Sequence, residues 1–95
     1  HHLLVYQVNN KPYRETPGKE YSVREFLQST SSLEYVWHRD KEDRYVQPIN
    51  YSDWKLQLDN TVPVEFGNSK LFIPKETYHR LIKGTGDITL KVWKL

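Results

Sequence analysis

Residues 67–94 read GNSKLFIPKETYHRLIKGTGDITLKVWK, and this stretch decides the fold that we expect for the chain. After an opening turn, residues 70–73 have the apolar character of a short strand. Residues 87–95 end the sequence with a strand of alternating polarity, which places its apolar side chains on one face. These side chains are Ile88, Leu90 and Val92.

The segment between these two strands, residues 74–83, fits two local structures. Pro74 is favourable at the first position of a helix, and Gly84 would follow the end of that helix. A loop that contains a strand explains the segment equally well, so both alternatives stay open.

Towards the N-terminus, short strand patterns alternate with turns. They cover residues 3–8, 33–38, 44–49, 54–58 and 62–66. Strands at this spacing predict an all-β sandwich or barrel, with the strand at residues 3–8 on a sheet edge. We expect a core of Trp37, Trp54, Leu56, Phe66, Phe72, Ile73, Leu90 and Val92.

One exception to the strand pattern lies near the N-terminus. Ser22-Val23-Arg24-Glu25 has the form of a capping box, in which the Ser and Glu side chains bond to free backbone N–H groups. We therefore predict a short helix within residues 22–29.

The composition predicts one small domain over residues 1–95. His1 and His2 resemble the remains of a purification tag. Cysteine is absent, which excludes disulfides and thiolate metal sites and fits a cytoplasmic protein. The net charge of +2 is scattered without a basic stripe, so we expect no nucleic-acid partner. We expect no membrane partner, because no apolar run approaches the roughly 20 residues that span a bilayer.

Residues 67–94 resemble the second conserved motif of the cupin family, G-x5-P-x-G-x2-H-x3-N. Pro74 and His79 fall on its Pro and His, and Ile73 supplies the apolar residue that usually precedes the Pro. The resemblance implies a double-stranded β-helix, a jelly-roll-like barrel of two antiparallel sheets. The chain departs from the motif at Asn68, Glu76 and Lys83, which stand for Gly, Gly and Asn.

The first cupin motif, G-x5-H-x-H-x3,4-E-x6-G, can be laid over residues 32–51. His38 takes the first His position, Asp40 takes the second, and Arg44 or Tyr45 takes the Glu position. The family's Glu is therefore missing from its expected place.

His38, Asp40 and His79 are the candidate metal ligands. On a strand, residues 38 and 40 point to the same face, and the resemblance places all three residues at cupin ligand positions. Two His and one carboxylate on one side of an ion form the facial triad of non-haem iron enzymes. We expect a divalent ion such as Fe, Mn, Ni or Zn, and no nucleotide cofactor. The alternative is that His38 and Asp40 are ordinary surface or rim residues, and that His79 simply hydrogen-bonds to a backbone carbonyl.

A small-molecule pocket would involve other side chains at the barrel mouth. Arg44 would repel a cation unless it binds a substrate carboxylate or pairs with Glu42 or Asp43. Together with Gln57 and Tyr78 it is our candidate for substrate binding, because pockets combine aromatic groups with a few polar ones.

Three functional hypotheses follow. The first is a cupin domain that binds a small molecule and a divalent metal, which would suit an oxygenase or an isomerase. The second is a non-catalytic structural or interaction module with an aromatic-filled barrel, used as a homodimer through sheet edges. The third is a swapped-hairpin DNA-binding regulator, suggested by Ile-Pro-Lys-Glu at residues 73–76. Whether the domain is an enzyme is left open by the sequence.

Overall fold

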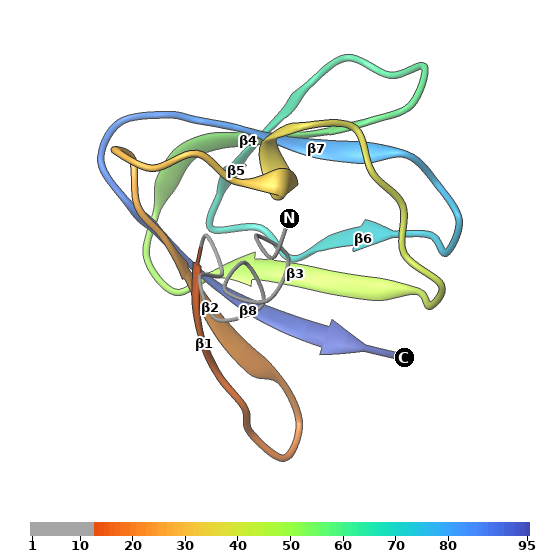
Figure 1. Cartoon of the computed structure of the whole chain (residues 1–95), viewed down its shortest axis with the longest axis horizontal. Coiled ribbons are helices and arrows are strands. Elements are labelled where there is room, and N and C mark those ends of the chain that lie inside the picture. The colour runs from red at the N-terminus through yellow and green to blue at the C-terminus, as the bar shows by residue number, and fades with distance from the viewer. Residues whose placement is uncertain (1–12) are drawn as a thin grey trace, which may run out of the picture.

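Eight strands and one short 3-10 helix make up the computed structural model, which describes residues 13–95 (Figure 1). The strands are β1 (Tyr13–Thr16), β2 (Ser22–Phe26), β3 (Arg44–Pro48), β4 (Ser52–Leu58), β5 (Val64–Gly67), β6 (Leu71–Ile73), β7 (His79–Ile82) and β8 (Ile88–Lys94). The 3-10 helix is η1 (Leu33–Tyr35). No helix in this part of the chain is long and apolar enough to cross a membrane. The strand predicted over residues 3–8 lies outside the described residues.

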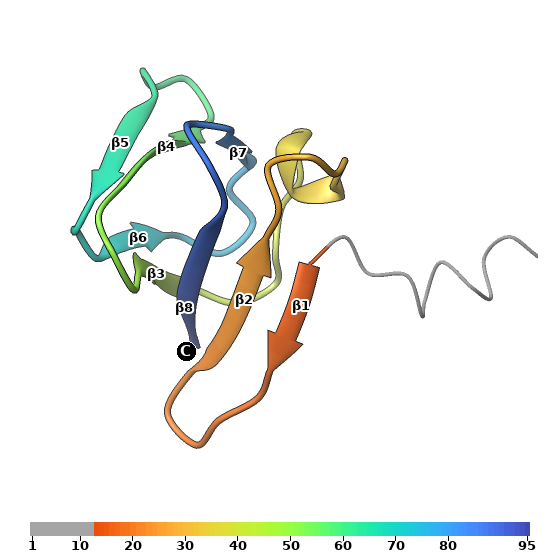
Figure 2. The same ribbon diagram turned by 90° about the vertical axis from the view of Figure 1, so that its left-hand side faces the viewer.

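The strands form two antiparallel sheets that lie on opposite sides of the core (Figure 2). The larger sheet has the order β1-β2-β8-β3-β6, and the smaller sheet has the order β5-β4-β7. The last strand, β8, therefore lies between two strands from the first half of the chain. The predicted all-β barrel of two antiparallel sheets is confirmed. A swapped-hairpin regulator would need a different architecture, so the third hypothesis gains no support.

The predicted N-terminal helix is wrong, because residues 22–26 form strand β2. This strand pairs with β1 on one side and with β8 on the other. Both neighbours bond to its backbone, whereas a capping box can satisfy only the first N–H groups of a helix. The alternation of Arg24 and Phe26, both buried, with Val23 and Glu25 also suits a strand better than a helix.

The segment over residues 74–83 takes the second of its two predicted forms, a turn followed by strand β7. Glu76 has a φ of 60°, in the left-handed region that glycine adopts most easily. This is the position at which the cupin motif carries a glycine. The turn therefore takes a left-handed conformation with a residue that is strained by it.

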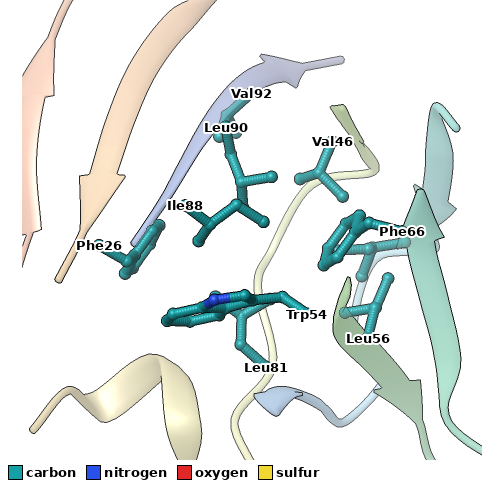
Figure 3. Close-up of a cluster of buried hydrophobic side chains, with 10 residues drawn as sticks. Phe26, Val46, Trp54, Leu56, Phe66, Leu81, Ile88, Leu90 and Val92 are labelled. Carbon is teal, nitrogen blue, oxygen red and sulfur yellow. The ribbon is translucent and has the colours of Figure 1, made fainter. Parts of the chain in front are cut away.

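A cluster of buried side chains fills the space between the two sheets (Figure 3). Trp54 and Phe66 have no exposed surface. The prediction of the core is confirmed for Trp54, Leu56, Phe66, Ile73, Leu90 and Val92. The cluster also contains Phe26, Val46, Leu81 and Ile88.

The core prediction is wrong for Trp37 and Phe72, which are 43% and 42% exposed. Phe72 precedes the buried Ile73 on β6, and neighbouring strand residues point to opposite faces. Its ring packs on the outer face against Tyr45, with the ring centroids 5.0 Å apart. Trp37 lies outside the strands, and the Arg80 guanidinium stacks 4.8 Å above its ring.

A polar clasp holds the loop between β7 and β8 against β4. The Asp53 carboxylate accepts hydrogen bonds from the Thr85 backbone N–H at 2.7 Å and from the Thr85 hydroxyl at 2.8 Å. These bonds hold the pKa of Asp53 below its ordinary value. The buried Trp54 donates its indole N–H to the Gly86 carbonyl at 3.0 Å. Gly84 lies inside this clasp.

We predict that Gly84→Ala destabilises the domain by about 2 kcal/mol, within the usual cost of overpacking. A methyl group at this position would meet the Asp53 carboxylate and would come within 2.7 Å of the Trp54 backbone nitrogen. Gly86→Ala is the matched control, because φ is +70° there but no atom lies within 4 Å. Urea unfolding measures both variants. An equal or smaller loss in the free energy of unfolding for Gly84→Ala than for Gly86→Ala would contradict the prediction.

We also predict that Glu76→Gly stabilises the domain by about 0.5–1 kcal/mol, because glycine relieves the left-handed strain. Asn60→Gly is the control, since Asn60 has the same φ of 60° but asparagine tolerates it better. Thermal unfolding should show a larger gain for Glu76→Gly than for Asn60→Gly. A loss of stability at residue 76 would contradict the prediction.

Candidate metal site

Two backbone hydrogen bonds bring His38 beside His79. The His38 N–H donates to the His79 carbonyl at 3.1 Å, and the His79 N–H donates to the His38 carbonyl at 2.8 Å. His79 begins β7 and pairs with Leu58 of β4, so His38 lies on the other side of the same strand. The two imidazole centroids are 4.2 Å apart.

The structure brings together all three predicted ligands. One ligand atom from each of His38, Asp40 and His79 lies within 4.8 Å of the other two. The site reaches from the interior to the surface, because the His79 side chain is 4% exposed and that of His38 is 20% exposed. This proximity agrees with the predicted geometry, and metal binding itself stays a prediction.

Each imidazole is oriented by a carbonyl two residues earlier in the chain. His38 Nδ1 lies 2.9 Å from the Val36 carbonyl oxygen, and His79 Nδ1 lies 2.8 Å from the Thr77 carbonyl oxygen. A carbonyl only accepts hydrogen bonds, so both Nδ1 atoms carry hydrogen. In the neutral imidazoles, the lone pair is therefore on Nε2.

Both Nε2 atoms face carboxylate oxygens. His38 Nε2 lies 3.1 Å from Glu34 Oε1, and His79 Nε2 lies 3.2 Å from Asp40 Oδ2. Among the described residues, no hydrogen-bond partner satisfies His38 Nε2 or Asp40 Oδ2, although both atoms are buried. A lone pair facing an anionic oxygen is repulsive unless a proton or a cation lies between them. The arrangement therefore suits a shared cation.

The two histidines have opposite pKa shifts. Burial alone would lower the pKa of His38. The hydrogen bonds to Glu34 and to the Val36 carbonyl, together with the charges of Glu34 and Asp40, outweigh burial and raise this pKa. Burial, helped by the charge of His38, lowers the pKa of His79. Burial alone would raise the pKa of Glu34, yet its contact with His38 and the surrounding positive charges hold it below its ordinary value. Without a metal, a proton on the cluster is therefore held on His38.

Arg44 points into the site, where it pairs with two carboxylates. Its Nη2 lies 2.9 Å from Glu42 Oε1 and 3.4 Å from Asp40 Oδ1. The guanidinium thus engages Oδ1 of Asp40, while Oδ2 of the same carboxylate faces His79. Arg44 therefore holds Asp40 in place. The carboxylates of Asp40 and Glu42 compensate the charge of Arg44, and the Glu42 pair is one of the alternatives that the sequence offered for Arg44.

The site borders a small internal cavity of about 20 Å³. The polar lining comes from Arg24, Glu34, Asp40, Arg44 and His79, and the apolar lining includes Leu90 and Val92 of β8. A volume of this size holds about one water molecule.

Two of the predicted substrate-binding residues lie elsewhere. The Gln57 side chain is bonded to Arg80 at 2.9 Å and to the Thr61 carbonyl at 3.1 Å. Tyr78 is exposed on the surface, with the Arg39 guanidinium 5.3 Å from its ring centroid. Neither residue lines the cavity that Arg44 borders.

Glu34 is the site residue that the sequence analysis missed. It lies on η1, four residues before His38, and its side chain is 20% exposed. In the strand predicted over residues 33–38, Glu34 shares the alternation of His38 and falls on the same face. The predicted strand is wrong here, because residues 33–35 form η1 and only His38 makes a β-bridge, so strand parity was not a sound signal for Glu34.

Comparisons with known proteins support the fold. A scan against protein-family models finds no match, and a search of the curated proteins finds no relative. Protein NMB1881 of Neisseria meningitidis matches with a TM-score of 0.59 and 15% identity, over 87% of this chain and 81% of that protein.

Two further solved structures are similar. A "putative mannose-6-phosphate isomerase" from Ralstonia eutropha has a TM-score of 0.61 at 12% identity, over 86% of this chain and 81% of that one. A cupin domain from Bordetella pertussis has a TM-score of 0.55 at 14% identity, over 90% of this chain and 95% of that one. The TM-scores show a shared fold. At identities this low, the similarity says nothing about a shared function.

We predict that Glu34→Gln destabilises the metal-free domain more at about pH 5.5 than at about pH 8. A raised pKa means that protonated His38 stabilises the fold fully below its unfolded pKa of about 6.5. This contribution is lost as the pH rises through the folded pKa, and Glu34 is a main cause of the shift. Urea unfolding in a chelator measures the difference at each pH. An equal deficit at both pH values would contradict the assignment.

Proposed function

We propose that this cupin-fold domain binds one divalent metal ion through His38, Asp40 and His79. The observation that carries the proposal is the convergence of His38 Nε2 and Asp40 Oδ2 beside His79 Nε2. The first two atoms are buried without a hydrogen-bond partner among residues 13–95. Imidazole and carboxylate ligands without thiolate suit Fe, Mn, Ni or Zn.

The supporting contacts are those that metal-binding histidines usually have. The Val36 and Thr77 carbonyls accept from Nδ1 of the two histidines and keep both Nε2 atoms directed at the site. Arg44 fixes the remaining oxygen of Asp40. A bound ion would supply Lewis-acid chemistry to an oxygen ligand. The chain's own contribution is to orient three ligands before the ion arrives.

Space limits the small molecule that the proposed site can take. The internal cavity of about 20 Å³ holds about one water molecule, so an organic ligand does not fit in this cavity. Such a ligand would approach from the solvent side, where His38 and Glu34 keep part of their surface exposed.

A second candidate function is a non-catalytic interaction module. The filled barrel favours it, because Trp54, Phe66 and Phe26 have almost no exposed surface and leave little interior space. Under this proposal, partners would bind outside the barrel, for example as a homodimer through the β1 edge of the large sheet.

The test is metal binding to the chain without His1 and His2, which could bind metal themselves. We expect about one equivalent of Ni²⁺ or Zn²⁺ by calorimetry. An ion at about 100 times its Kd should stabilise the fold by about 2.7 kcal/mol, or roughly 10 °C or more in Tm. Asp40→Asn and His79→Gln should lose most of this shift.

His79 is buried, so Asp40→Asn is the variant that decides the outcome if His79→Gln fails to fold. Binding below about a tenth of an equivalent, with no thermal shift in the folded wild-type chain, would contradict the metal proposal and leave the interaction module.

A further inference from the structure

We infer that Glu34 is a fourth ligand of the metal site, and that a bound ion therefore ties the η1 segment to the barrel. This inference rests on the proposed function. It assigns a role to a carboxylate at a position that the first cupin motif leaves unspecified. Glu34 comes four residues before His38, whereas the Glu of that motif comes after His38 in the sequence.

The η1 turn holds Glu34 in an inward orientation. Ser32 caps the turn by accepting a hydrogen bond from the Glu34 N–H at 2.9 Å. The next residue, Tyr35, packs its ring against Trp54 and Phe26, with centroids 5.8 and 6.4 Å apart. Glu34 therefore lines the same cavity as Asp40 and His79, although it belongs to a segment outside the two sheets.

The distance between the histidine and the carboxylate of each pair suits two neighbouring ligands of one ion. Ligand atoms that each lie about 2.1 Å from a metal are separated by about 3.0–3.4 Å in octahedral or tetrahedral sites. Glu34 Oε1 and His38 Nε2 are 3.1 Å apart, and Asp40 Oδ2 and His79 Nε2 are 3.2 Å apart. Glu34 is thus close to one histidine as Asp40 is close to the other. It lies outside the group that His38, Asp40 and His79 form within 4.8 Å, so its carboxylate would have to turn towards Asp40 and His79 to share their ion.

The local charges also call for a further carboxylate. Arg44 is shared between Asp40 and Glu42, which leaves one negative charge in that group. A divalent ion with two neutral imidazoles would leave a net positive charge in a partly buried site, and this is costly. The carboxylate of Glu34 brings the group to neutrality. Arg24, the other buried cation of the cavity, has its own partner in Glu15 at 3.0 Å.

A fourth ligand on η1 has a structural consequence. The segment around η1 exposes Leu33, Val36 and Trp37, and its contacts with the barrel come mainly from Tyr35 and His38. Few buried apolar contacts mean a low free energy of local opening. An ion bound to both Glu34 and His79 would link the segment to β7 and oppose that opening.

The experiment compares Ni²⁺ binding to the chain without His1 and His2 at about pH 8, above the ordinary pKa of imidazole. The variants are Glu34→Gln, Glu34→Asp, Asp40→Asn and the control Glu76→Gln, whose side chain is 54% exposed. Losing an outer contact of a metal ligand already costs about 10–100-fold in affinity, so Glu34→Gln should bind at least about tenfold more weakly. Glu76→Gln should match the wild type.

Glu34→Asp separates ligation from charge, because it keeps the negative charge but shortens the side chain. A ligand role predicts weaker binding for this variant too, and wild-type affinity would overturn it. Hydrogen exchange gives a second readout. Ni²⁺ should protect the amides of residues 33–37 in the wild type and not in Glu34→Gln.

The outcomes distinguish the two proposals. If Asp40→Asn weakens binding while Glu34→Gln matches Glu76→Gln, the fourth ligand is wrong and the three-ligand site stands. If the folded wild-type chain takes up no Ni²⁺ or Zn²⁺, the proposed function fails and Glu34 has no metal to bind. Metal-free Tm values show whether each variant is folded.

Discussion

The central position of β8 is the constraint on which the rest of the structure depends. This strand pairs with β2 through residues 88–92 and with β3 through residues 90–94, so it joins the two halves of the large sheet. Its inner face supplies Ile88, Leu90 and Val92 to the core, and the last two also line the cavity under the site. The pairing of β2 with β8 joins residues that are far apart in the sequence. The barrel therefore closes only when the two ends of the described chain meet.

The candidate site combines three residues that fall on cupin motif positions with a further carboxylate. The motif positions hold His38, Asp40 and His79, while Arg44 replaces the family's Glu and braces Asp40 instead of facing an ion. Glu34 supplies a carboxylate from the other direction. A motif specifies residues only at fixed positions, and Glu34 stands at a position that the first motif leaves open.

Sequence analysis reached the features that local periodicity or fixed spacing determines. Alternation identified the inner faces of β4 and β8, and the spacing of the motifs brought His38 near His79. It failed where distant partners decide. β2 was predicted as a helix because a capping box is a local signal, whereas its partners β1 and β8 are not. Phe72 and Ile73 were both assigned to the core, although adjacent strand residues cannot share a face.

The β-bridge between His38 and His79 also covers part of an edge of the small sheet. β7 is an outer strand of that sheet, and its backbone groups on the side away from β4 would otherwise be free to pair with another molecule. The His38 backbone occupies two of these groups at the start of β7. Detachment of the segment would uncover a template for intermolecular β-pairing. The same contact that assembles the ligands therefore also covers the start of this sheet edge.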